Sequence, residues 1–129
     1  MTSLLKSFIN SIMRIIGIIY DQIIRSFLSD LKLSGLSQNS IRFYKSDISS
    51  FTLWLKLKIR KTGILADDFK DLLPFIKSSF GESYKNDLIS KSTPDVTINR
   101  KLSVLRRFSD FLYSKEFLSF DFAKNLQNI

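Results

Sequence analysis

The sequence contains no cysteine and no histidine among its 129 residues, and each absence excludes a class of function. Without cysteine the chain can form no disulfide, no thiolate zinc site and no cysteine nucleophile. Without histidine it lacks the commonest metal ligand and the commonest general base. We therefore expect no catalytic residue, no metal site and no cofactor, and we expect that the chain as it stands is not an enzyme.

Glycine and proline are scarce as well, with four and two residues. Few turn-forming residues favour long helices over a many-stranded sheet, and no alternation of apolar and polar residues persists as it would in strands. No glycine-rich phosphate loop is present, so a nucleotide site is not indicated. The length suits one domain with a substantial core. The predicted fold class is therefore all-α.

The first nineteen residues are predicted to form an amphipathic helix. Its apolar stripe comprises Leu4, Leu5, Phe8, Ile9, Ile12, Ile15, Ile16 and Ile19. Lys6, Asn10 and Arg14 interrupt the apolar run, which argues against a membrane-spanning helix. Three roles remain open: packing on its own domain, binding a partner protomer, and lying on a membrane surface. The two cations suit the last role poorly, so a membrane is the least favoured of the three partners, and we expect a cytoplasmic setting.

Two further helices are predicted over residues 20–33 and 38–59. Gly35 lies where the first should stop, and Ser37 is a good N-cap for the second. The core side of the second helix comprises Ile41, Tyr44, Ile48, Phe51, Leu55 and Ile59. Another side carries donors and small side chains, namely Gln38, Arg42, Lys45, Ser46 and Ser49. No acid lies on that side, because Asp47 points elsewhere on the helical wheel.

A short helix is predicted next, from Asp67 or Asp68 as its cap through about Phe80. Pro74 should kink or restart it. The polar residues 81–93 are predicted to form a loop.

The last long helix is predicted over residues 95–115, with Pro94 at its start. Its buried line comprises Ile98, Leu102, Leu105, Phe108 and Leu112. The opposite side carries Arg100, Ser103 and Arg107 on successive turns. Two guanidinium groups and a hydroxyl on an otherwise unpaired face suit phosphate groups or guanine edges, and the alternative is a solvent-facing arginine pair. Residues 121–129 are predicted to trail off without a closing element.

The charge of the chain is unevenly placed. Lysine and arginine total 20 against 12 acidic residues, for a net charge of +8. Residues 38–61 carry six basic residues and one acid, and residues 91–107 carry five and one. Residues 62–90, between them, carry three basic residues and five acids. Two basic helices that the fold brings together would form a basic face that suits a polyanion, whereas separate solvated faces would only aid solubility.

Two stretches of the sequence resemble the core-binding domain of tyrosine recombinases. Residues 27–51 present an apolar helix, then Gly-Leu-Ser, then a helix with an aromatic and a basic residue before an Asp. Residues 97–108, with the sequence TINRKLSVLRRF, resemble the last core helix of that domain. The stretch DFAKNL at residues 121–126 resembles its closing segment, although Asp121 and Phe122 stand where Asn-Pro is usual. The resemblance covers residues 21–126.

The resemblance implies a SAM-like bundle of four core helices plus the N-terminal amphipathic helix. It divides the chain into an N-terminal extension (1–19), a core-binding domain (20–120) and the start of a linker (121–129). In the family this domain is half of a C-shaped clamp around double-stranded DNA. The arginines, lysine, histidines and nucleophilic tyrosine of the catalytic domain would follow Ile129, so none of the four tyrosines here inherits the nucleophile's role. Either a truncated recombinase or a stand-alone relic fits this pattern.

The resemblance and the charge pattern together predict a DNA-binding surface on the helices at 38–59 and 95–115. The predicted DNA-binding residues are Ser37, Gln38, Asn39, Arg42, Lys45, Ser46, Thr97, Arg100, Lys101, Ser103 and Arg107. Phosphate contacts are expected from Arg42, Lys45, Ser46 and Lys101. Ser37, Gln38 and Asn39 are expected near the DNA backbone, because the exposed amides of a helix start favour phosphate. Arg100, Ser103 and Arg107 are expected nearest to base edges. No small-molecule substrate is expected, and a homo-oligomer on DNA through the N-terminal helix stays open.

The alternative function belongs to another class. The apolar N-terminal helix would dock a partner in a protein–protein interaction module, and the charge would merely keep the chain in solution. A helical bundle of this kind serves either function, so the fold alone does not choose between them.

Overall fold

The structure is a computed structural model that describes residues 2–19 and 21–129, with only the backbone described for residues 13–19. Every regular element in the described part of the chain is helical, which confirms the predicted all-α class. The α-helices are α1 (Ser3–Ile19), α2 (Gln22–Leu33), α3 (Gln38–Arg60), α4 (Phe69–Leu72), α5 (Phe80–Ser90) and α6 (Asp95–Ser114). A 3₁₀ turn, η1 (Leu73–Phe75), follows α4.

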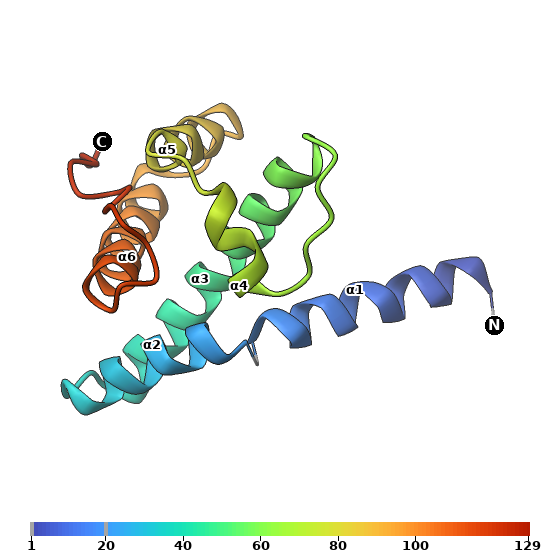
Figure 1. Cartoon of the computed structure of the whole chain (residues 1–129), viewed down its shortest axis with the longest axis horizontal. Helices are drawn as coiled ribbons and strands as arrows, with labels where there is room; N and C mark the ends of the chain where they lie inside the picture. Colours follow the sequence, from blue (N-terminus) through green and yellow to red (C-terminus); the bar gives the residue numbers. More distant parts are fainter. Residues whose placement is uncertain (1, 20) are drawn as a thin grey trace.

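Helix α3 is the central element, packed against α2, α4 and α6 (Figure 1). The apolar faces predicted for α3 and α6 are confirmed, because their residues from Ile48 to Ile59 and from Ile98 to Leu112 are buried. Aromatic rings join the helices: Phe108 of α6 lies 5.0 Å from Phe27 of α2, centroid to centroid. Because α3 and α6 share this core, the two basic blocks, residues 38–61 and 91–107, lie next to each other in space.

The connector between α2 and α3 has the predicted chemistry. Gly35 adopts a φ of +92°, in the left-handed region that suits glycine after a helix. The hydroxyl of Ser37 accepts a hydrogen bond from the backbone N–H of Ser40 at 3.2 Å, which caps α3.

The start of α4 differs from the prediction. Asp68 occupies the N-cap position but makes no side-chain cap hydrogen bond. Instead, Asp21 at the start of α2 accepts hydrogen bonds from the backbone N–H of Ile23 at 2.9 Å and of Phe69 at 3.0 Å. One carboxylate therefore caps two helices that are far apart in sequence.

The prediction for residues 67–93 was wrong in its boundaries. The helix that starts at Phe69 ends at Leu72, and the 3₁₀ turn that holds Pro74 follows it. Residues 80–90 form helix α5 rather than part of a loop. Few apolar residues mark α5, so its periodicity is weak, but Tyr84 packs edge-on against Phe51 at 5.1 Å. Tertiary packing therefore stabilises a helix that its own sequence scarcely signals.

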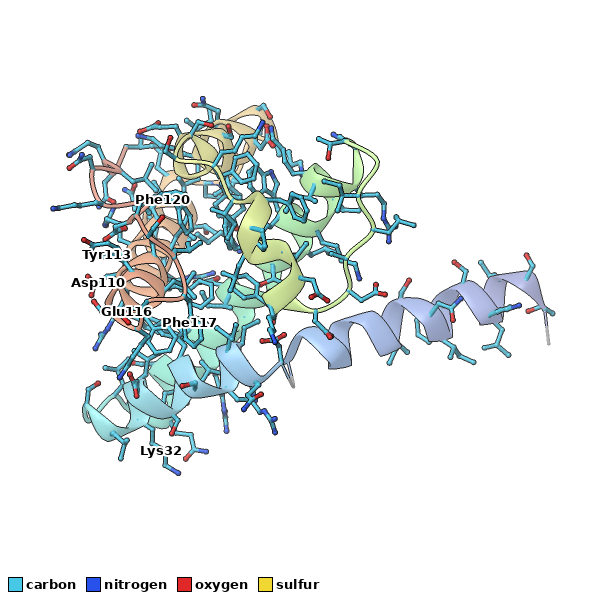
Figure 2. The ribbon with its side chains drawn as sticks, viewed as in Figure 1. Lys32, Asp110, Tyr113, Glu116, Phe117 and Phe120 are labelled. Carbon is cyan, nitrogen blue, oxygen red and sulfur yellow. The ribbon has the colours of Figure 1, made fainter. Side chains whose placement is uncertain are left out.

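The C-terminal segment does not trail off as predicted. Figure 2 shows Glu116 and Phe117 where the chain turns after α6, and Phe120 on its way back along that helix. Phe122, Ala123 and Leu126 are buried. The hydroxyl of Ser109 on α6 donates a hydrogen bond to the carboxylate of Asp121 and accepts one from the N–H of Ala123 at 3.2 Å. A buried serine thus fastens the closing segment to the core.

Helix α1 extends beyond the bundle toward the N-terminus (Figure 1). All side chains from Thr2 to Ile12 are exposed, including the apolar Leu4 (82% exposed) and Phe8 (62%). This part of α1 therefore does not pack on its own domain, although the helix as a whole contacts α3 and α2. The side chains of Ile15, Ile16 and Ile19 in the predicted stripe lie outside the described residues. Within the described chain, no helix combines the length and apolar character needed to cross a membrane.

Candidate nucleic-acid interface

Helices α3 and α6 pack directly against each other, which brings the two basic blocks together. The guanidinium of Arg100 on α6 donates from Nε to Oδ2 of Asp47 on α3 at 3.0 Å. Its Nη2 donates to the other carboxylate oxygen, Oδ1, at 2.9 Å. Two parallel hydrogen bonds of this kind make a bidentate ion pair, which fixes direction as well as distance.

The first half of α3 exposes most of the predicted phosphate contacts. Arg42, Lys45 and Ser46 are exposed on the helix, and Ser37, Gln38 and Asn39 are exposed at its start. Backbone N–H groups in a first helical turn have no partner within the helix, and the helix dipole favours an anion there. The exposed cations and the N-terminus of α3 thus lie on one helix within three turns.

The interpretation of the α6 face as unpaired was wrong. Asp47 does lie away from the exposed cations of its own helix, but it faces α6 and is only 2% exposed. There it pairs with Arg100 and also accepts a hydrogen bond from Nζ of Lys101 at 3.4 Å. The helical wheel considers one helix at a time, so it missed an acid presented by the neighbouring helix.

These pairings leave Arg100 and Lys101 unequal in access. The side chain of Arg100 is 42% exposed, whereas that of Lys101 is 14% exposed. The guanidinium of Arg100 also lies over the ring of Phe43, 5.2 Å from its centroid. Hydrogen bonding to Asp47 raises the pKa of Arg100 above its usual value, so its charge is permanent.

Arg107 connects α6 to the beginning of α3. Its Nη1 lies 3.5 Å from the hydroxyl of Tyr44, and its Nη2 lies 3.4 Å from the hydroxyl of Ser34. Its guanidinium carbon is 5.8 Å from the centroid of the Tyr44 ring. The two hydrogen bonds are long, and Arg107 stays exposed, so its donors can exchange these partners for a ligand.

The remaining predicted residues on α6 have different surroundings. Ser103 is exposed and accepts a hydrogen bond from Nη2 of Arg106 at 3.0 Å, and Thr97 is half-buried. Arg106 also donates from Nη1 to the backbone oxygen of Leu126 at 3.0 Å. The second basic block therefore includes one arginine that holds the C-terminal segment.

Part of the first basic block also serves the fold. Lys56 is 5% exposed, and its Nζ lies 2.9 Å from Oδ1 of Asp67. Arg42 and Lys45 are exposed in the N-terminal half of α3, while Arg60 is exposed and Lys58 half-buried near its C-terminal end.

Two supporting residues were not among the predicted site residues. Phe43 and Asp47 hold Arg100 from two sides. A signal for Asp47 was present, because it is the single acid in a basic block and lies next to the buried Ile48. In the described residues no group of three or more carboxylates is placed to hold a metal ion.

These features define a class: a small helical bundle in which two basic helices pack directly against each other. The chain belongs to the family described as phage integrase, N-terminal SAM-like domain, which its residues 24–116 match. This finding confirms the resemblance to tyrosine recombinases and the SAM-like architecture.

Two curated relatives are similar to the chain. Tyrosine recombinase XerD of Rickettsia conorii is 32% identical over 93 residues, which cover 71% of this chain and 26% of the relative. Tyrosine recombinase XerC of Thermodesulfovibrio yellowstonii is 29% identical over 107 residues, which cover 82% of this chain and 31% of the relative. The chain thus spans roughly a quarter to a third of the length of these relatives. No solved structure gives a significant match.

Proposed function

We propose that this chain is a DNA-binding module of a site-specific tyrosine recombinase or integrase. Its role is to grip duplex DNA at a recombination half-site through α3 and α6, and so to position a catalytic domain. The chain itself contributes no reacting group. The observation that carries this proposal is the packing of the two basic helices, joined by the Arg100–Asp47 pair at their interface.

The contacts divide into two kinds. Arg42, Lys45 and Ser46 bind phosphates along one strand, and the first turn of α3, from Ser37 to Asn39, binds a further phosphate. Lys101 adds to the positive potential more than to direct contact, because little of its side chain is exposed. These contacts position the module without reading sequence.

Arg100, Ser103 and Arg107 lie nearest to the base edges, with Thr97 beside them on α6. A planar guanidinium pairs well with the two acceptors of guanine in the major groove. The orientation that Arg100 already has supports this role, because a held fork loses less entropy on binding than a mobile one.

A titration of labelled duplex with the whole chain at several salt concentrations tests the proposal. With roughly four to six phosphate contacts, the logarithm of the affinity falls against that of salt with a slope near −0.9 per contact. An affinity that does not respond to salt overturns the proposal. The double variant Arg42→Ala/Lys45→Ala should lower both affinity and slope.

Lys70→Ala/Lys77→Ala is the matched control, because it removes two exposed charges from the acidic region between the basic blocks. Its affinity should stay within about twofold of the starting chain, since charges remote from the contact are screened. Equal losses in the two double variants would indicate diffuse attraction and no defined face.

A second function is favoured by one observation, the exposed apolar stripe on α1. Under this alternative α1 docks a partner protein and the cations are solvated. Size-exclusion chromatography of the chain and of Leu4→Ser/Phe8→Ser separates the two functions. A change of assembly with unchanged DNA affinity assigns α1 to partner binding and leaves the DNA function with α3 and α6.

A further inference from the structure

The buried acid Asp47 lies directly behind the proposed DNA-binding face. It accepts two hydrogen bonds from Arg100 and one from Lys101. Its charge also raises the pKa of the buried Tyr84 hydroxyl, after burial itself, which is the larger cause. An acid beneath a cationic surface opposes DNA binding by simple electrostatics, so its presence there calls for a physical reason.

The geometry of Arg100 supplies that reason. A guanidinium has five N–H donors in a rigid fork, and Asp47 occupies the Nε and Nη2 side. The ring of Phe43 lies against one face of the group. The Nη1 edge is not used by Asp47, and the side chain remains partly exposed. Arg100 is therefore held on two sides and accessible on a third.

Holding a long side chain in one orientation has a measurable benefit. A free arginine loses rotamer freedom when it binds, whereas a held one has lost it already. The plane of the Arg100 guanidinium is also fixed. A fixed plane helps a guanidinium to bind two coplanar acceptors, whereas it gives no advantage in binding a single point charge.

We propose that Asp47 is a positioning residue for DNA binding, which acts through Arg100 by presenting the Nη1 edge of its guanidinium in one fixed orientation toward the nucleic acid. This inference rests on the proposed function and adds to it a residue that touches no DNA. Phe43 supports the same orientation through the face of its ring.

The direction in which Asp47→Asn changes the affinity for DNA separates positioning from simple electrostatics. Asp47→Asn keeps the shape of the side chain and raises the net charge by one. If charge alone mattered, the variant would bind duplex DNA more tightly. If Asp47 positions Arg100, the variant binds about five- to tenfold more weakly, because the bidentate charge-assisted pair that sets the direction is lost.

Asp71→Asn is the matched control for charge, because Asp71 is exposed and lies on α4. It gives the same charge change without contacting Arg100, so its affinity should not fall. The double variant Asp47→Asn/Arg100→Ala should bind no more weakly than Arg100→Ala alone. Additive losses would mean that Asp47 does not act through Arg100 and would overturn the inference.

Circular dichroism shows whether Asp47→Asn folds. If it does not fold, a second variant, Arg100→Lys, tests the positioning role. Arg100→Lys keeps the charge and a partner for Asp47 but removes the fork. It should lose nearly as much affinity as Arg100→Ala, and more than Arg42→Lys loses. Affinity equal to that of the starting chain in Arg100→Lys would overturn the inference.

The two proposals fail in different ways. If the starting chain binds duplex DNA without salt dependence, the proposed function itself is wrong. If it binds with the expected salt dependence while Asp47→Asn binds equally or more tightly, only the positioning role is wrong.

Discussion

Helices α1 and α6 are built on the same kind of amphipathic pattern, yet they have opposite surroundings. The apolar line of α6 is buried throughout, and its polar side is tied to α3 through Arg100 and Arg107. The described side chains of α1, from Thr2 to Ile12, are exposed on every side. The difference shows that the spacing of apolar residues predicts a helix and its apolar face. That face stabilises the fold only where another element of the bundle packs against it.

The largest expected difference lies between one phenylalanine of each helix. Phe108→Ala should lower the free energy of unfolding by about 3–5 kcal/mol, because it removes a fully buried ring and leaves a cavity. Phe8→Ala should change it by less than about 0.5 kcal/mol. Urea denaturation followed by circular dichroism measures both. A large loss in Phe8→Ala would break the comparison by showing that α1 is covered in solution.

The polar sides of the two helices give the next difference. Among the described residues, Arg100→Ala leaves the buried Asp47 with Lys101 as its one remaining cationic partner, so the free energy of unfolding should fall by about 1–3 kcal/mol. This value is below that of a fully buried pair, because Arg100 is partly exposed. Lys6→Ala on α1 should be neutral within about 0.5 kcal/mol. Equal melting temperatures for the two variants would show that the Asp47 pair contributes little.

The junction after α1 gives a smaller effect. Asp21→Ala removes the cap of α2 and the partner of the Phe69 N–H, at an expected cost of about 1–2 kcal/mol in unfolding free energy. Asp68→Ala should cost less, because Asp68 makes no side-chain cap hydrogen bond. Thermal melts of the two variants side by side provide the check, and the reverse order would contradict the assignment.

The smallest effect, and a change of opposite sign, is expected at Tyr84. In the described part of the chain its buried hydroxyl has no hydrogen-bond partner, so Tyr84→Phe should be neutral or stabilise the fold by up to about 1 kcal/mol. A stability loss above that size would reveal a partner for the hydroxyl.

Tyr84 also makes stability depend on alkaline pH. Burial and the charge of Asp47 raise its pKa in the folded state above the ordinary value near 10. The unfolded chain then releases the phenolic proton first, so its contribution to stability is full below about pH 10 and is lost as pH rises further. Denaturation at pH 9 and pH 11 should show a smaller decline in Tyr84→Phe than in the starting chain.

The sequence predicted the long helices well because their signals are local. Ser37 caps α3 and Gly35 follows the end of α2 as expected, and both depend on neighbours within three residues. Helix α5 was missed because Tyr84 is held by Phe51, which is distant in the chain. The packing of Phe122 was missed for the same reason, since its ring stacks on Phe51 at 5.7 Å.

The candidate site shows the same division. Exposure of Arg42 and Lys45 follows from one helix and could be predicted. The burial of Asp47 against Arg100 could not be predicted. The two residues are 53 positions apart in sequence, and their contact depends on how α3 and α6 face each other. A wheel drawn for each helix alone has no means of finding a pair between them.

The double cap at Asp21 also bears on the order of folding. Its hydrogen bond to Phe69 spans 48 positions, whereas the one to Ile23 spans two. Contacts of high sequence separation form only after the intervening chain has paid its loop-closure entropy. Helices α2 and α3 can thus assemble as a hairpin from local interactions, and α4 joins afterwards at a residue that was already in place.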